Sequence, residues 1–183
     1  MSEVLSWVFA VLTALVVVAW YLSYSAARLD RLHVRLSGTL AALDGQLVRR
    51  AEASVELATS GVLDGATALI LADAAADSLA VPHEEGEARE TVESHLTEAL
   101  RLAVTPEIVE ALRAGGSIGP EYLERLSSAC TRVQLARRFH NDAVTDVRRV
   151  RRKWVVRIFH LAGHTPMPGT VEFNDECPEH LGL

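Results

Sequence analysis

Residues 4–27 read VLSWVFAVLTALVVVAWYLSYSAA and contain no charged side chain. As a helix rising about 1.5 Å per residue, this stretch is longer than the roughly 30 Å hydrocarbon core of a bilayer. Aromatic residues mark both ends, as in the belts found at the headgroup level: Trp7 near the first, and Trp20, Tyr21 and Tyr24 near the second. The stretch predicts a single transmembrane helix, with residues 1–27 as a membrane anchor.

A cleaved signal peptide is the alternative interpretation of this segment. It would need positive charge before the apolar run and a shorter apolar core, whereas the charged side chain found there is Glu3. The small residues at 25–27 are of the kind that a signal peptidase recognises, so cleavage stays an alternative. Arg28, Arg31 and Arg35 follow the run, and the positive-inside rule then predicts an outside N-terminus with the rest of the chain in the cytoplasm.

The remaining composition favours a helical core built from Ala, Leu and Val. Five of the ten aromatic residues lie in the first 27 positions, which disfavours a β-sandwich or barrel for the rest of the chain. Arginine outnumbers lysine 17 to 1, a bias typical of GC-rich bacterial genomes, so we expect a bacterial inner membrane. Two cysteines are too few for a disulfide framework, and we expect Cys130 to pack as a small apolar residue.

Charge is strongly segregated along the sequence. The net charge is +3 over residues 28–51, −12 over 52–124 and +8 over 125–157, within a total of −6. Surfaces of opposite sign are therefore expected. The acidic stretch 84–93 is expected to form a solvated helix face.

Helical spacing of small and apolar residues continues from residue 28 onward. These residues recur at intervals of three and four positions, which gives 3.67 residues per turn and predicts a long, nearly straight helix. The recurring residues are Leu29, Leu32, Leu36, Leu40, Leu43, Leu47, Ala51, Ser54 and Ala58. Shorter helices are predicted over 66–80, 84–103 and 106–114, the first capped by Asp64 and the last by Thr105 before Pro106. A second long helix is predicted from Gly119-Pro120 through the basic run toward Gly163.

These elements predict an all-α fold. We expect one N-terminal transmembrane helix followed by an up-and-down, four-helix-type antiparallel bundle with two long helices over residues 28–162. Residues 163–183 are expected to be a polar, flexible tail. Whether residues 61–65 bend one helix or separate two remains open at the level of the sequence.

The end of the last helix carries a dense basic segment. In an even-numbered bundle this helix returns to the membrane, near Arg28, Arg31 and Arg35. We therefore expect these residues and the basic segment together to contact anionic lipid or a partner, at Arg28, Arg31, Arg35, Arg148, Arg149, Arg151, Arg152, Lys153, Trp154 and Arg157. The alternative is a solvated basic face that pairs with the acidic middle of the chain. Nucleic-acid binding is not expected, because the domain as a whole is not basic.

Two segments carry a resemblance to a known family. Residues 42–50 read ALDGQLVRR, a leucine-patterned run that ends in a basic pair, and residues 136–144 read ARRFHNDAV. In these segments the chain resembles the LemA family of membrane-anchored bacterial proteins; the matching positions are Arg49, Arg50, Ala136, Arg137, Phe139, Asn141, Ala143 and Val144. The chain departs from the family at His140, where tyrosine is usual, and at 151–153, where a proline is usual.

The resemblance implies architecture and location: an outside N-terminus and a cytoplasmic helical bundle. It supplies no catalytic residues and no cofactor. The sequence itself contains no glycine-rich phosphate loop, no G-x-S-x-G elbow and no H-E-x-x-H. One group of residues consists of side chains that commonly bind zinc: His160-x3-His164 followed by Cys177-x2-His180. The alternative is that these residues are simply polar residues at a helix end and in the tail after it.

We therefore expect a non-catalytic, membrane-anchored helical scaffold or adaptor. It would hold a protein partner, or a second copy of itself, through its helices. The alternative is a membrane-surface regulatory module that binds anionic lipids through residues 148–159. A cryptic metal-dependent enzyme is a third hypothesis.

Overall fold

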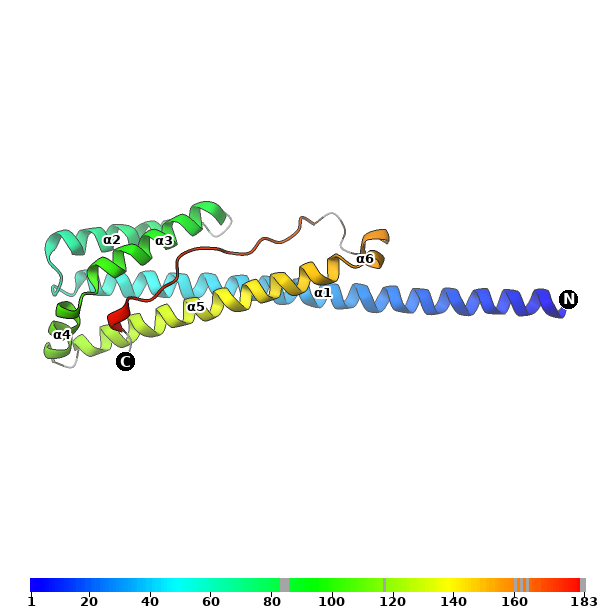
Figure 1. Ribbon diagram of the computed structural model, residues 1–183, viewed down its shortest axis with the longest axis horizontal. Coiled ribbons are helices and arrows are strands. Elements are labelled where there is room, and N and C mark those ends of the chain that lie inside the picture. Colours follow the sequence, from blue (N-terminus) through cyan, green and yellow to red (C-terminus); the bar gives the residue numbers. More distant parts are fainter. Residues whose placement is uncertain (83–85, 117, 160, 162, 164, 182–183) are drawn as a thin grey trace. The chain divides into compact units, whose positions relative to one another are not determined.

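The chain folds into helices, as the composition predicts. The computed structural model describes residues 1–82, 86–116, 118–159, 161, 163 and 165–181, and over these residues it contains no strand (Figure 1). The elements are α1 (Ser2–Thr59), α2 (Gly65–Ala80), α3 (Gly86–Ala103), α4 (Pro106–Ala114), α5 (Ile118–Arg151), α6 (Trp154–Ile158) and a 3-10 turn η1 (Glu179–Leu181). The all-α prediction is confirmed.

The first half of α1 carries the apolar segment. An 18-residue window in this helix has a mean hydropathy of 2.2, and none of the window is buried against the rest of the chain. By length and composition this helix can cross a membrane. The Trp20 and Tyr24 rings stack with centroids 6.3 Å apart, and both side chains, like Trp7 and Tyr21, are exposed. An apolar helix surface left uncovered by protein is what a lipid-facing segment requires.

Local capping fixes where the shorter helices begin. Asp64 Oδ1 accepts hydrogen bonds from the backbone N–H groups of Ala66 and Thr67 at 3.0 and 3.1 Å, which starts α2. Gly61 before it has a φ of +77°, so residues 61–65 separate two helices rather than bend one. Thr105 caps α4, with Pro106 in the first turn, as predicted.

The last long helix ends earlier than expected. α5 stops at Arg151, Lys153 is extended, and the short α6 begins at Trp154. The prediction of one helix running on toward Gly163 was therefore wrong. Like charges three and four residues apart destabilise a helix, and the cluster of cations from Arg148 onward supplies several such pairs.

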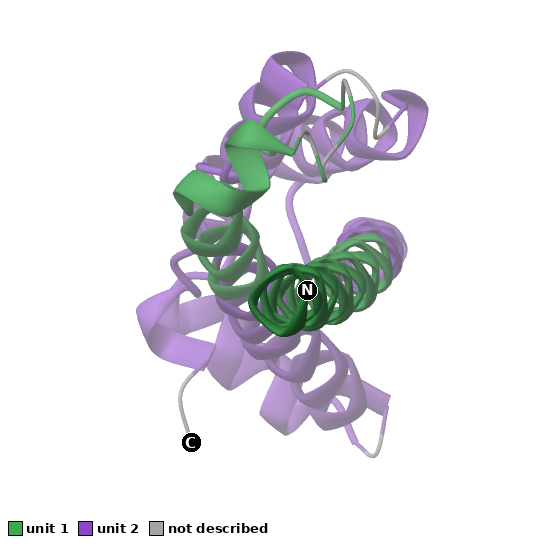
Figure 2. Cartoon of the chain, turned by 90° about the vertical axis from the view of Figure 1, so that its right-hand side faces the viewer, with its two compact units in different colours: residues 1–38, 142–169 green, residues 39–141, 170–183 purple. Residues whose placement is uncertain are grey.

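The chain divides into two compact units (Figure 2). Unit 1 comprises residues 1–38 and 142–169, and unit 2 comprises 39–141 and 170–183. In unit 1, Leu29 packs in one cluster with Val150 and Val156. The Arg35 guanidinium lies 3.6 Å from the Asp146 carboxylate. These contacts show that the parts of α1 and α5 in unit 1 run antiparallel.

Unit 2 has its own core. The parts of α1 and α5 that it contains are also antiparallel, because Thr39 faces His140 whereas Glu56 pairs with Arg125. The α2 and α3 helices pack side by side (Figure 1). The core is built from aliphatic side chains, including Leu57, Leu71, Leu96, Leu100, Val109, Leu112 and Leu126.

Protonation of one buried histidine should weaken unit 2. Burial lowers the pKa of His140, whose Nδ1 lies 3.4 Å from Thr39 Oγ1. Since the folded pKa lies below the unfolded value of about 6.5, the unfolded chain binds the extra proton first as the pH falls. The stability contributed by neutral His140 is therefore fully present above the unfolded pKa of about 6.5, and it is lost as the pH falls toward the lower folded pKa.

We therefore expect the free energy of unfolding to fall more steeply from about pH 7.5 to about pH 5.5 in the wild type than in His140→Gln. Denaturant unfolding followed by circular dichroism in detergent measures both slopes. Equal slopes for the two proteins would contradict this role of His140.

Candidate functional site

Two groups of side chains gather residues that the sequence singled out. The first is the basic segment, residues 148–159 in unit 1. The second surrounds the C-terminal segment, residues 170–181 in unit 2. Each group lies within one compact unit.

The cations of the basic segment fall into two groups. Arg148 Nε donates a hydrogen bond to the Pro168 carbonyl at 2.8 Å, and Arg151 donates to the carbonyls of Pro166 and Thr165. These two arginines therefore hold the chain that follows α6. The remaining cations of the segment are exposed to solvent: Arg149, Arg152, Lys153 and Arg157.

Exposed apolar side chains lie among these exposed cations. Trp154 is 69% exposed, and Ile158 and Phe159 are also exposed, whereas Val155 and Val156 are buried. Val156 packs in the cluster that contains Leu29. Because Leu29 follows closely on the apolar stretch 4–27, the basic segment lies beside the end of that stretch, where Arg28 and Arg31 are exposed as well.

In unit 2 a buried carboxylate connects three helices. Glu93 of α3 has no exposed surface, and Arg50 of α1 is 1% exposed. Arg50 Nη2 donates to Glu93 Oε2 at 2.6 Å, and Ser78 Oγ of α2 donates to Oε1 at 2.7 Å. Arg89 Nε lies 2.9 Å from the same Oε1. A buried carboxylate requires such partners, because its desolvation is otherwise unfavourable by several kcal/mol.

The arginines of this cluster have further partners. Arg50 also donates to the Glu93 carbonyl and to Thr97 Oγ1, both at 3.1 Å. Arg89 donates to the Val81 carbonyl at 2.6 Å and lies 3.5 Å from the Asp44 carboxylate. The cluster therefore fixes α1, α2 and α3 in one register.

Sequence reasoning placed Glu93 on a solvated acidic face, and this was wrong. Leu96 and Leu100 follow it at three and seven residues, which places Glu93 on the buried side of α3. The spacing alone could have revealed this position. Its partners Arg50 and Ser78 lie on other helices, so the spacing within α3 could not identify them.

The C-terminal segment lies in an extended conformation between α3 and α5 (Figure 1). On the α5 side, Asn141 Nδ2 donates to the Val171 carbonyl at 3.1 Å and its Oδ1 accepts from the Val171 N–H at 2.9 Å. Gln134 donates to the Asp175 carbonyl at 2.8 Å. The segment therefore runs antiparallel to α5.

Side chains of α3 bind the other edge of its backbone. Ser94 Oγ accepts from the Asn174 N–H at 3.2 Å, and Thr97 Oγ1 donates to the Asn174 carbonyl at 2.6 Å. Glu90 Oε1 accepts from the Glu172 N–H at 2.9 Å. Polar side chains thus take the place that a neighbouring strand would occupy in a sheet, and they satisfy the backbone of the segment.

An aromatic ring anchors the middle of the segment. Phe173 is 9% exposed, and its ring centroid lies 5.8 Å from Arg50 Cζ and 5.7 Å from Arg137 Cζ, within reach of cation–π attraction. Arg137 also binds the Asp175 carboxylate through Nε at 2.8 Å and Nη2 at 3.0 Å. This bond raises the pKa of Arg137. Instead of a free tail, we find a docked segment whose Phe173 and Leu181 are buried.

The residues of the family-like pattern divide accordingly. Arg50, Arg137 and Asn141 meet around the C-terminal segment. Ala143 and Val144 are buried, and Ala136 is half-buried. Arg49 and Phe139 are exposed, and Phe139 joins Leu135, Thr39, Ala42, Gln46, Arg132 and Ala136 around a shallow pocket of 210 Å³.

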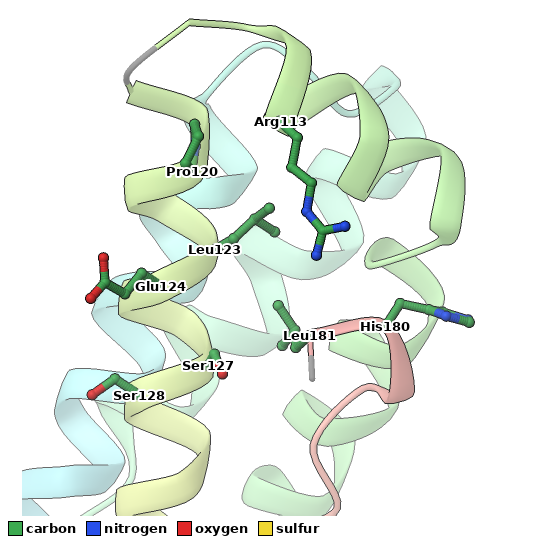
Figure 3. A pocket seen from close by; sticks show the side chains of 8 residues that line it. All are labelled: Arg113, Pro120, Leu123, Glu124, Ser127, Ser128, His180 and Leu181. Atoms are coloured by element: carbon green, nitrogen blue, oxygen red, sulfur yellow. The ribbon is translucent and has the colours of Figure 1, made fainter. Parts of the chain in front are cut away.

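A larger pocket of 520 Å³ lies between α4, the start of α5 and η1 (Figure 3). Its surface is largely apolar, from Pro120, Leu123 and Leu181, with Arg113 and His180 at its sides (Figure 3). Among the described residues that line it, no catalytic pair comes together.

The predicted zinc ligands are His160, His164, Cys177 and His180. His160 and His164 lie outside the described residues. Within the described part of the chain, no three His, Cys, Asp or Glu side chains form a group that could hold a metal ion. Cys177 instead packs against the core cluster that contains Cys130.

Comparison with family models, curated proteins and solved structures gives no match for this chain.

Removing the buried negative charge should destabilise unit 2 strongly. The isosteric substitution Glu93→Gln leaves Arg50 buried without its counter-ion and leaves Arg89 with the Asp44 carboxylate alone. Breaking a buried pair in this way costs about 3–5 kcal/mol. Denaturant unfolding in detergent measures the loss. Glu110→Gln on the exposed side of α4 is the matched control, with an expected change within about 0.5 kcal/mol. Equal midpoints for Glu93→Gln and the control would contradict the account.

Proposed function

We propose that the protein is a membrane-anchored helical scaffold or adaptor rather than an enzyme. In this proposal the apolar stretch of α1 spans a bacterial inner membrane with its N-terminus outside, and the helices after it form a four-helix-type bundle in the cytoplasm. The resemblance to the LemA family supports this arrangement. The role of the bundle would be to hold a protein partner, or a second copy, next to the bilayer.

The observation that carries the proposal is an exposed apolar surface on α5. Leu135 and Phe139 are 49% and 53% exposed and lie one turn apart. They border the shallow pocket of 210 Å³, whose wall also includes Arg132. An exposed aromatic ring next to an apolar hollow and an arginine has the composition of a protein-binding hot spot.

A photocrosslinking experiment tests this surface. With a photoreactive phenylalanine analogue at position 139 of the full-length protein in membranes, we expect one discrete adduct, whose mass tells a second copy from another protein. Substitution of Leu135 by Ser should remove this adduct, because it takes away one of the two large exposed apolar side chains of this surface. The same analogue at exposed Leu102 on α3 is the control. The absence of a discrete adduct at 139, or equal adducts at 139 and 102, would sink the proposal.

A second candidate function is a regulatory module that binds anionic lipid through the basic segment. The observation in its favour is that Arg149, Arg152, Lys153 and Arg157 are exposed, together with Trp154, beside the end of the apolar stretch. Cations interleaved with exposed aromatic and aliphatic side chains are typical of segments that lie in a membrane interface.

Vesicle binding tests the lipid candidate. Replacement of Arg149, Arg152, Lys153 and Arg157 by Gln removes about 1 kcal/mol of attraction each, so cosedimentation of residues 28–183 with anionic vesicles should weaken at least tenfold. The matched control replaces four exposed arginines of unit 2: Arg49, Arg113, Arg132 and Arg138. Circular dichroism confirms that each protein is folded. Equal weakening by both sets would show that the basic segment has no special role.

A further inference from the structure

The docked C-terminal segment brings the two cysteines of the chain together. Cys130 and Cys177 are 47 positions apart in the sequence, and both are free thiols. Gln134 of α5 donates a hydrogen bond to the Asp175 carbonyl. Further along the segment, Leu181 lines the same pocket as Leu123, which is nearer the start of α5. Because the segment runs antiparallel to α5, Cys177 comes level with Cys130, one helical turn before Gln134.

The surroundings of the two thiols differ. Cys130 is buried in the core of unit 2, and Cys177 is half-buried against the same cluster. Hydrogen bonding between the thiols raises the pKa of Cys130 and lowers that of Cys177, which Arg50 lowers further. Cys177 is therefore both the more accessible thiol and the one that ionises first, as expected of the nucleophile in thiol oxidation.

We propose that Cys130 and Cys177 are a redox-sensitive pair, and that their oxidation to a disulfide fixes the C-terminal segment covalently to α5. Their placement on opposite sides of one packing contact carries the proposal. The segment is otherwise held by side-chain hydrogen bonds, ion pairs and the Phe173 ring, all of which can open reversibly. A covalent bond would keep the segment over Arg50, Arg137 and Asn141.

A peroxide can serve as the oxidant. The Cys177 thiolate attacks one oxygen of hydrogen peroxide, the O–O bond breaks, and the leaving hydroxide takes up a proton to give water and a sulfenic acid. The Cys130 sulfur then attacks Cys177 Sγ and loses its proton. The S–O bond breaks, and the leaving hydroxide takes that proton to form a second water. Two thiols are oxidised and one peroxide is reduced.

The test uses the full-length protein in detergent, first reduced and then treated with a slight excess of hydrogen peroxide. We expect the two free thiols to be lost together, with an intramolecular Cys130–Cys177 peptide found after digestion under non-reducing conditions. Peptide mapping separates this product from oxidation of Met1 or Met167. Cleavage after Glu172 by a Glu-specific protease should be at least about tenfold slower in the oxidised protein than in the reduced protein, because the segment can no longer detach.

Single substitutions distinguish the two roles. Cys130→Ser should leave a sulfenic acid on Cys177 that a dimedone reagent traps, whereas Cys177→Ser should react with peroxide far more slowly. Both replacements are small and leave Phe173 and Asp175 in place, so circular dichroism should show folded proteins. The proposal is overturned if the wild type forms only intermolecular disulfides or keeps its thiols. It is also overturned if the disulfide forms without slowing cleavage after Glu172.

Discussion

Glu93 carries a carboxylate into the interior of unit 2, where Arg50, Arg89 and Ser78 surround it. An uncompensated charge in such a place is unfavourable by several kcal/mol, so the partners must all arrive in the right geometry. Each partner belongs to a different part of the chain: Arg50 to α1, Ser78 to α2 and Arg89 to α3. Aliphatic packing alone would tolerate small slips between these helices, whereas the ion cluster specifies one register.

The same cluster extends to the C-terminal segment through Arg50. Its guanidinium binds Glu93 and Thr97 and also lies over the Phe173 ring, as does the guanidinium of Arg137. Thr97 in turn donates to the Asn174 carbonyl. The interior charge and the docked segment therefore depend on one another. Substitution of Arg50 would therefore disturb both, whereas the neighbouring Arg49 is exposed.

The helix caps could be predicted from the sequence, whereas contacts between distant segments could not. Asp64 and Thr105 begin helices through hydrogen bonds to residues two or three positions away, so sequence spacing reveals them. The docking of residues 170–181 depends on contacts such as Thr97 with Asn174, 77 positions apart. Its composition is polar, and the isolated Phe173 gives no periodic pattern. The exposure of Leu135 and Phe139 likewise depends on which faces of α5 the other elements cover.

Hydrogen–deuterium exchange at Val171 and Asn174 tests the central claim, that side chains of α3 and α5 hold the C-terminal segment in place. These two backbone N–H groups donate to Asn141 Oδ1 and Ser94 Oγ, so in the wild type both should exchange far more slowly than an unstructured peptide of the same sequence. In Asn141→Ala the exchange of Val171 should accelerate, because its acceptor is gone. Exchange of both amides at the rate of the free peptide in the folded wild type would contradict the account.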